Sequence, residues 1–206
     1  MSEWQLFPAG TVPEFSTPAF FAAHDWVPGE AQIGHPERLA MVVELIVDLG
    51  IDGYDDVVDL GAGDGSLLRL IDARLPGIDC WGYDLGIANQ RHAEANGVDV
   101  SLVDIVENLA VLDLAGLIVC TEVLEHLVDP HRFLDDLAGV AAPDTVLIAS
   151  SPHLETPDWH YEHHCWAWDQ AGYAELLAAH RWAPFAHRTV TVGRYGFQAV
   201  AARLTP

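Results

Sequence analysis

Glycines and an acid follow the first long apolar run of the core sequence. Residues 57–65 read VVDLGAGDG, in which Asp59 precedes Gly61, Gly63 and Gly65. A strand that leads through such a glycine turn into a helix lets backbone N–H groups approach a ligand closely. The pattern therefore predicts a ligand-binding loop.

Two further acids end the next two apolar runs. Asp84 follows the glycines at about twenty residues, the offset of an acid that binds a ribose. Asp104 could accept a hydrogen bond from an adenine amino group. Because ligands bind beyond the carboxyl ends of parallel strands, we expect these two acids and Asp59 to meet at one crevice.

A second group of reactive side chains begins at residue 122. Glu122, Glu125 and His126 are spaced i, i+3 and i+4, which predicts that one helix face carries all three. Two carboxylates and an imidazole can bind a divalent metal or form an acid–base pair. Residues 153–168, HLETPDWHYEHHCWAW, contain four histidines, among them His163 and His164, and could cover the same cleft.

The elements that must position these residues alternate between strand and helix. Apolar runs predict strands at 55–60, 78–84, 98–104, 117–121 and 145–150. Helical spacing predicts helices from Pro18 and over 36–49, 66–74, 86–96, 122–127 and 129–140, with 1–17 as an irregular lead-in. This alternation favours a parallel sheet buried on both faces. Residues 184–192 and 196–204 predict a closing antiparallel hairpin.

The motif at 57–65 resembles the first motif of class I S-adenosylmethionine (SAM)-dependent methyltransferases, and the resemblance covers roughly 35–205. It implies a Rossmann-like α/β fold: a seven-stranded, mostly parallel sheet with helices on both faces and the last strand antiparallel. It also implies SAM binding by Asp59, Gly61, Ala62, Gly63, Gly65, Asp84, Leu85, Asp104, Ile105 and Thr121. A dinucleotide fingerprint would need glycine where Ser66 stands. A nicotinamide enzyme and a purely structural glycine turn are the alternatives.

EVLEH at 122–126, followed by HxxxW at 164–168, resembles two metal-using branches of that family. One comprises the small-RNA 3′-terminal 2′-O-methyltransferases, and the other the ubiquinone-pathway O-methyltransferases that act on catechols. The resemblance implies a Mg²⁺ or Mn²⁺ site made by Glu122, Glu125, His126 and His164, with His163 competing for the last place. Without metal, His126, His163 or His164 would act as general base. ExxEH also occurs in family members with no known metal.

The charge balance bears on the substrate. The chain has 31 acidic and 9 basic residues, a net charge of −22 and no lysine. Proteins that grip a nucleic-acid backbone rely on basic residues that displace counterions, so this composition argues against that class of partner. Ahead of the first core strand, only Phe7-Pro8 resembles the FxPP-type motif of the RNA branch. We therefore expect O-methylation of a small-molecule hydroxyl; RNA 3′-terminal ribose 2′-O-methylation and a non-catalytic SAM-binding protein are the alternatives.

At 206 residues the sequence predicts a single domain, with 1–50 as an N-terminal helical lid and 51–206 as the catalytic core. Trp26, Gln32, His35 and Arg38 are lid candidates for substrate contact. No apolar run reaches the length of about 18 residues that a membrane span needs, and the first residues do not resemble a secretion signal. Three widely spaced cysteines are typical of a reducing cytoplasm.

Overall fold

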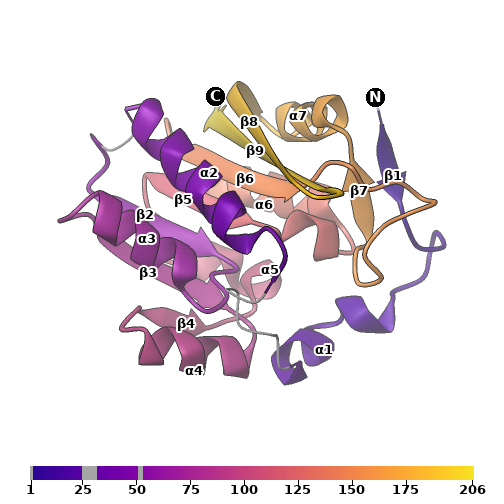
Figure 1. Cartoon of the computed structure of the whole chain (residues 1–206), viewed down its shortest axis with the longest axis horizontal. Helices are drawn as coiled ribbons and strands as arrows, with labels where there is room; N and C mark the ends of the chain where they lie inside the picture. The colour runs from indigo at the N-terminus through magenta and orange to yellow at the C-terminus, as the bar shows by residue number, and fades with distance from the viewer. Residues whose placement is uncertain (1, 25–31, 51–52) are drawn as a thin grey trace.

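The computed structural model describes residues 2–24, 32–50 and 53–206, and its centre is a seven-stranded sheet (Figure 1). Its strands are β2 (Asp56–Leu60), β3 (Asp79–Asp84), β4 (Val100–Leu102), β5 (Leu117–Thr121), β6 (Val146–Pro152), β8 (Trp182–Val192) and β9 (Tyr195–Leu204). Their order is β4-β3-β2-β5-β6-β9-β8. The first five pair in parallel, and β9 runs antiparallel to both of its neighbours. The predicted Rossmann-like sheet and its closing hairpin are confirmed.

Helices cover both faces of this sheet, and they do so because alternate strand residues point to opposite sides. The helices are α2 (His35–Asp48), α3 (Ser66–Arg74), α4 (Ile87–Ala95), α5 (Ile105–Asn108), the 3₁₀ turn η4 (Leu109–Val111), α6 (Pro130–Val140) and α7 (Gln170–Ala179). Val57 packs into the cluster beneath α2, α3 and α4, whereas Val58 packs into the cluster beneath α5, α6 and α7. None of the described helices is long and apolar enough to cross a membrane.

The N-terminal segment is more ordered than the irregular lead-in that its sequence predicts. β1 (Glu3–Gln5) pairs antiparallel with β7 (Trp166–Trp168) in a separate two-stranded sheet. The carboxylate of Glu3 accepts a hydrogen bond from the indole N–H of Trp168 at 2.8 Å. This strand depends on a distant partner, so no local period signals it. The 3₁₀ turn η1 (Glu14–Ser16) and α1 (Pro18–Ala23) follow, and α1 begins at Pro18 as predicted.

The helix predicted over 122–127 is wrong, and with it the argument that one helix face carries its acids and histidine. Glu122 has a φ of 56°, in the left-handed region, and its N–H bonds to the carbonyl of Ser150 in β6 at 3.1 Å. This bond ties the backbone at Glu122 to the sheet, at the residue where the predicted helix would have to start. Only one 3₁₀ turn, η5 (Leu124–His126), forms before α6 begins at Pro130.

Strand β4 is shorter than predicted, which changes the position of Asp104. The acid lies two residues beyond Leu102 and caps α5, because its Oδ1 accepts the N–H groups of Val106 at 3.0 Å and Glu107 at 3.3 Å. Asp104 still lines the cavity at the carboxyl edge of the sheet, where the candidate site lies. No element was predicted at α7 or β7.

Candidate functional site

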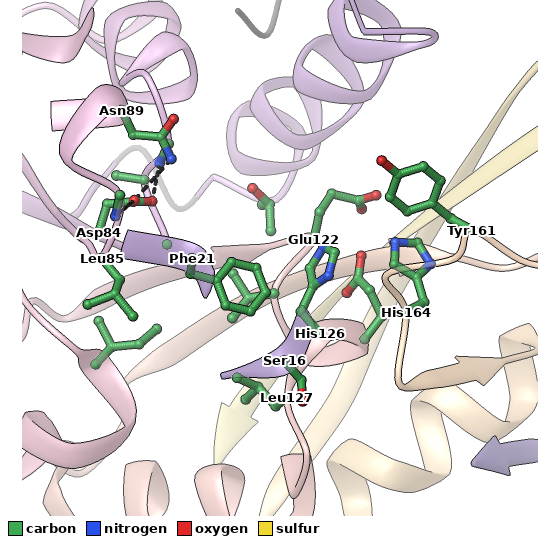
Figure 2. Close-up of a pocket in the computed structure, with 18 of the residues that line it drawn as sticks. Ser16, Phe21, Asp84, Leu85, Asn89, Glu122, His126, Leu127, Tyr161 and His164 are labelled. Carbon is green, nitrogen blue, oxygen red and sulfur yellow. Dashed lines mark hydrogen bonds between the residues drawn. The ribbon is translucent and has the colours of Figure 1, made fainter. Parts of the chain in front are cut away.

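A cavity of about 920 Å³ lies at the carboxyl ends of β2, β3 and β5. This is where the strand order reverses, because β2 lies between β3 and β5, and open α/β sheets bind ligands at such a point. Figure 2 shows Asp84 and Leu85 on one side of the cavity, His126 and His164 on the other, and Phe21 of α1 between them. The cavity therefore has two ends with different chemistry.

The first end, here called the glycine-loop end, consists of Asp59, residues 61–65, Asp84 and Asp104. The N–H groups of Gly61 and Ala62 donate to the carbonyl of Tyr83 at 2.8 and 3.0 Å, which holds the loop against β3. Gly61 has a φ of 90°, and a Cβ there would lie 2.4 Å from Cγ2 of Val123. Only glycine fits this bend, which is where sequence analysis placed the ligand loop.

Asp84 fixes the shape of the loop through hydrogen bonds and also places a negative charge beside it. Its Oδ2 accepts the N–H of Gly63 at 2.9 Å, and its Oδ1 accepts the N–H of Gly86 at 2.7 Å and the side-chain amide of Asn89 at 3.0 Å (Figure 2). A carboxylate has about four acceptor positions, so one is left for a ligand hydroxyl.

Asp59 lies deeper, at the end of β2. Its side chain is 1% exposed, and its Oδ1 has no hydrogen-bond partner among the described residues. Burial, together with the nearby charge of Asp84, raises the pKa of this carboxyl to about 8. A buried carboxyl without a donor is suited to a cationic ligand group, which would compensate its charge.

Nine of the ten residues predicted for this end line the cavity: Asp59, Gly61, Ala62, Gly63, Asp84, Leu85, Asp104, Ile105 and Thr121. The tenth, Gly65, is not among the lining residues. It has a φ of 75° at the start of α3, where a Cβ would lie 2.9 Å from Cβ of Val98. Its role is therefore to let the loop turn into the helix.

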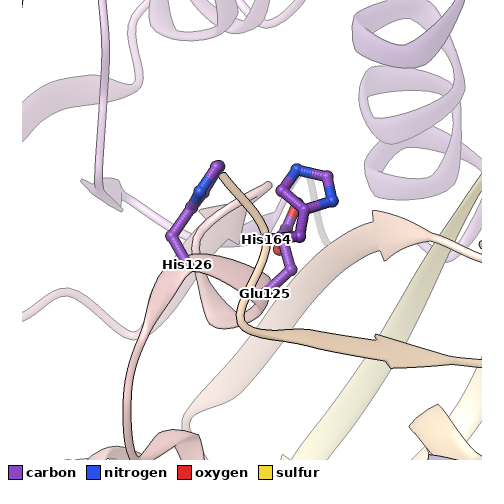
Figure 3. A group of neighbouring side chains, drawn as sticks. All are labelled: Glu125, His126 and His164. Carbon is purple, nitrogen blue, oxygen red and sulfur yellow. The ribbon is translucent and has the colours of Figure 1, made fainter. Parts of the chain in front are cut away.

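At the other end, Glu125, His126 and His164 form the group here called the three-ligand cluster. Each offers one ligand atom, and these atoms lie within 4.8 Å of one another (Figure 3). The first two residues come from η5 and the third from the loop ahead of β7. The N–H of Cys165 donates to the carbonyl of Glu125 at 2.6 Å, which joins these two segments beside the cluster.

Hydrogen bonds on the outer sides of the two imidazoles determine which nitrogen faces the cluster. Nδ1 of His126 lies 3.0 Å from the carbonyl of His163, and Nδ1 of His164 lies 2.6 Å from Oε2 of Glu155. The carbonyl of His163 can only accept, and so can the ionised carboxylate of Glu155, the pKa of which burial raises to about 7. With these partners, Nδ1 carries the proton and Nε2 the lone pair in each ring. Burial lowers the pKa of both histidines to about 3, which leaves both rings neutral, as metal binding requires.

The carboxylate of the cluster has unsatisfied acceptors. Glu125 is 1% exposed, and neither of its carboxylate oxygens has a hydrogen-bond partner among the described residues. Burial raises its pKa well above the ordinary range, and the neighbouring charge of Glu122 raises it further. A buried acid without donors, beside two imidazoles that present lone pairs, fits a divalent cation.

The other two predicted residues of this end occupy different positions. Glu122 lines the cavity, but its Oε1 accepts from the hydroxyl of Ser150 at 2.8 Å and its Oε2 pairs with Nη1 of Arg38 at 3.3 Å. His163 is not among the lining residues; its ring packs on Phe15 and its carbonyl supports His126. The structure therefore brings together three of the four predicted ligands.

Sequence reasoning missed Glu155, although the residue lies inside the histidine-rich loop that it singled out. No spacing rule connects an acid to a histidine nine residues later across an irregular loop, so only the folded structure reveals the pair. It also missed Phe21 and Tyr161, which line the cavity. The lid candidates Gln32, His35 and Arg38 line it as well, and Trp26 lies outside the described residues.

Comparisons with known proteins identify the family of the chain and its fold. A family model described as a methyltransferase domain matches residues 33–188. The chain is 26% identical over 139 residues to a ubiquinone biosynthesis O-methyltransferase of Rickettsia felis, which covers 63% of this chain and 57% of that protein. It is 31% identical over 105 residues to the protein of the same name in Actinobacillus pleuropneumoniae, with 46% and 44% covered. The chain thus spans about half the length of these curated relatives.

Among solved structures, the fold is similar to that of magnesium protoporphyrin IX methyltransferase from Synechocystis PCC 6803 with bound S-adenosylhomocysteine (SAH). The TM-score is 0.67 at 18% identity, and the match covers 84% of each chain. At this identity the likeness concerns the fold.

Proposed function

Because this chain belongs to the methyltransferase domain family, we propose that it transfers the methyl group of SAM to a hydroxyl oxygen of a small molecule, with a divalent cation held by the three-ligand cluster. One observation carries the proposal: a single cavity contains both the glycine-loop end and the cluster. Donor and acceptor can therefore meet inside one cavity.

The glycine-loop end suits SAM, which supplies a methyl group activated by a positively charged sulfonium. Asp84 offers its remaining acceptor position to the ribose, and Asp104 offers its carboxylate to the adenine amino group. Asp59, with its unsatisfied Oδ1, receives the methionine amine. These acids also explain why the loop suits a cationic donor better than a pyrophosphate, which they would repel.

The three-ligand cluster suits Mn²⁺ better than Mg²⁺, because Mg²⁺ prefers a shell of oxygens and imidazole nitrogen favours transition metals. Glu125 would supply the carboxylate, and His126 and His164 would supply Nε2. A bound cation would lower the pKa of an acceptor hydroxyl and orient it. If no cation binds, His126 or His164 takes the proton of that hydroxyl as general base.

The proposed acceptor is a vicinal diol or a catechol. Three protein ligands leave room on a cation for two neighbouring oxygens of a substrate. The cavity wall beyond the cluster contains the rings of Trp159, Tyr161 and Tyr195, which suit a planar acceptor. The curated relatives are named O-methyltransferases, which supports oxygen as the accepting atom.

Residues 1–50 are proposed to act as a lid over this cavity, with 51–206 as the catalytic core. Ser16 and Phe21 line the cavity from the N-terminal segment, and the ring of Phe21 meets that of His126 edge-on at 5.6 Å between centroids. A ring in this place would press an acceptor towards the cluster and keep water away from the transferring methyl group.

The proposal is tested by incubating the protein with SAM and a panel of catechols, monophenols and short RNAs, and measuring SAH. We expect SAH from a catechol, loss of activity after EDTA treatment, and recovery with Mn²⁺. Full activity after EDTA would remove the cation from the proposal. Activity on RNA alone, or SAM binding without SAH formation, would overturn the small-molecule acceptor or the catalytic role.

A further inference from the structure

Behind the three-ligand cluster, one buried acid supports the ring of His164. We propose that Glu155 is a positioning residue, which fixes the tautomer and the orientation of His164 so that Nε2 faces Glu125 and His126. This inference rests on the proposed function in one respect only, namely that His164 acts through its Nε2. The hydrogen bonding of the pair is a property of the protein itself.

The contacts of Glu155 divide between the ring and the backbone. Its Oε2 lies 2.6 Å from Nδ1 of His164, and its Oε1 accepts the N–H of Tyr161 at 3.2 Å. The side chains of Glu155 and His164 are 8% and 9% exposed, so little water competes for either group. A carboxylate held at both oxygens cannot turn away from the ring, and the ring cannot rotate without losing a short, buried hydrogen bond.

The tautomer follows from the chemistry of the two partners. A neutral imidazole has one N–H and one lone pair, and Glu155 in its ionised form can only accept. The proton therefore belongs on Nδ1, and the lone pair on Nε2. Without an acceptor at this place, the proton can reside on either nitrogen, and each ring with the proton on Nε2 presents a donor to the cluster. A carboxylate partner also makes Nε2 a stronger base and ligand.

The two histidines of the cluster differ in this support. His126 is held by a backbone carbonyl, that of His163, which no substitution of a side chain removes. The ring of His164 packs against the rings of His126 and Tyr161, but its hydrogen bond goes to the side chain of Glu155. The backbone around His164 has independent bonds, from its own N–H to the carbonyl of Tyr161 at 3.1 Å and from Cys165 to Glu125. A substitution of Glu155 should therefore change the tautomer and orientation of the His164 ring, while the backbone of the loop keeps its conformation.

The experiment compares the wild-type chain with Glu155→Ala, Glu155→Gln and the matched control Glu162→Gln. Glu162 lies on the same loop, but its side chain is exposed. The first measurement records ring ¹⁵N chemical shifts of His164 in the metal-free proteins, which identify the protonated nitrogen. The second measures the dissociation constant of Mn²⁺ alone by electron paramagnetic resonance.

We expect the wild type and Glu162→Gln to carry the proton on Nδ1, and Glu155→Ala to move at least part of it to Nε2. Loss of an outer-shell partner of this kind should weaken Mn²⁺ binding by roughly 10- to 100-fold. Glu155→Gln keeps a neutral acceptor, so its loss of affinity should be intermediate. It also provides a readout if Glu155→Ala fails to fold.

An unchanged tautomer in both Glu155 variants would overturn the inference, and so would an equal loss of Mn²⁺ affinity in Glu162→Gln. If the wild type binds no Mn²⁺ while Glu155→Ala shifts the tautomer, the positioning role of Glu155 is supported and the proposed cation is ruled out. The two proposals can therefore fail separately.

Discussion

The glycine-loop end is formed by residues 59–104, a continuous stretch of strands and helices, whereas the three-ligand cluster joins η5 to a loop that follows a later strand. In the first region the backbone determines the shape, and Asp84 already accepts three hydrogen bonds from its surroundings. In the second, side chains determine the shape, and both oxygens of Glu125 lack partners among the described residues. A bound ligand would therefore satisfy more unpaired acceptors at Glu125 than at Asp84.

The two ends nevertheless share a wall. Cγ2 of Val123, two residues before Glu125, fills the space that a side chain at Gly61 would need. Phe21 lies between the two ends and packs edge-on against His126. If the ends are separate in function, substitutions in one should spare ligand binding at the other; if the shared wall couples them, substitutions at the wall should disturb both.

The largest effect should follow from Glu125→Gln, which keeps the volume of the side chain and removes its charge. We expect Mn²⁺ affinity and turnover to fall by more than about 100-fold, because even outer-shell partners of metals cost 10- to 100-fold. SAH affinity should stay within about twofold of the wild type, because neither carboxylate oxygen of Glu125 has a hydrogen-bond partner, in the glycine loop or elsewhere, in the described part of the chain. Titration calorimetry with each ligand measures both values.

Asp113→Asn, a change of an acid remote from the cluster, is the control for the loss of one charge. If Glu125→Gln weakens SAH binding as much as Mn²⁺ binding, the two ends are not separate.

The converse substitution is Asp84→Ala. It removes an acceptor for a ligand hydroxyl and releases the N–H of Gly63, so SAH binding should weaken by about 1.5–3 kcal/mol, roughly 10- to 100-fold. The Mn²⁺ dissociation constant should not change. Equilibrium dialysis with labelled SAH and paramagnetic resonance with Mn²⁺ provide the two readouts, and normal SAH affinity in this variant would contradict the assignment of Asp84.

The shared wall is tested by Gly61→Ala. The new Cβ would clash with Val123, and the alanine would have to keep a φ of 90°. The free energy of unfolding should therefore drop by about 1–3 kcal/mol. In a Val123→Ala background the same change should cost less, because the clash is gone and only the backbone strain persists. A double-mutant cycle by urea denaturation measures this coupling, and strict additivity would show that the wall does not join the ends.

Most of the glycine-loop end could be predicted from the sequence, because its residues are close to one another in the chain. The turn, the strand before it and the acids after the next strands follow local rules of periodicity and spacing. Even there Gly65 serves the turn rather than the lining, since its backbone angle and the proximity of Val98 become visible only in three dimensions.

The structure brings together three of the four residues that the sequence predicts as metal ligands, but not in the way that the sequence predicts. Glu125 and His126 meet His164 through a 3₁₀ turn and an irregular loop, not through a helix face. No helix starts at Glu122 because its backbone N–H bonds to the carbonyl of Ser150. Its side chain pairs with Arg38, a residue of the distant helix α2. Such contacts between distant segments leave no period in the sequence.

The smallest expected effect concerns Asp59 and the pH dependence of stability. Burial raises its pKa to about 8 in the folded protein, against an ordinary value of 3.8 that the unfolded chain retains. The unfolded chain then binds fewer protons than the folded one between these values, so stability falls as pH rises. The contribution is complete below about pH 4 and is lost as pH approaches 8. From pH 6 to 7, wild type should lose about 1 kcal/mol more than Asp59→Asn.

Urea denaturation at both pH values measures this difference in ligand-free protein, and SAH then shows whether Asp59 belongs to the glycine-loop end. A ligand amine beside the carboxylate would favour its ionised form, so saturating SAH should reduce the pH dependence of wild type towards that of Asp59→Asn. Mn²⁺ should leave it unchanged, because the cation would be held at the opposite end of the cavity. An equal effect of both ligands would place Asp59 under the influence of both ends, and the separation of the cavity into two regions would no longer hold.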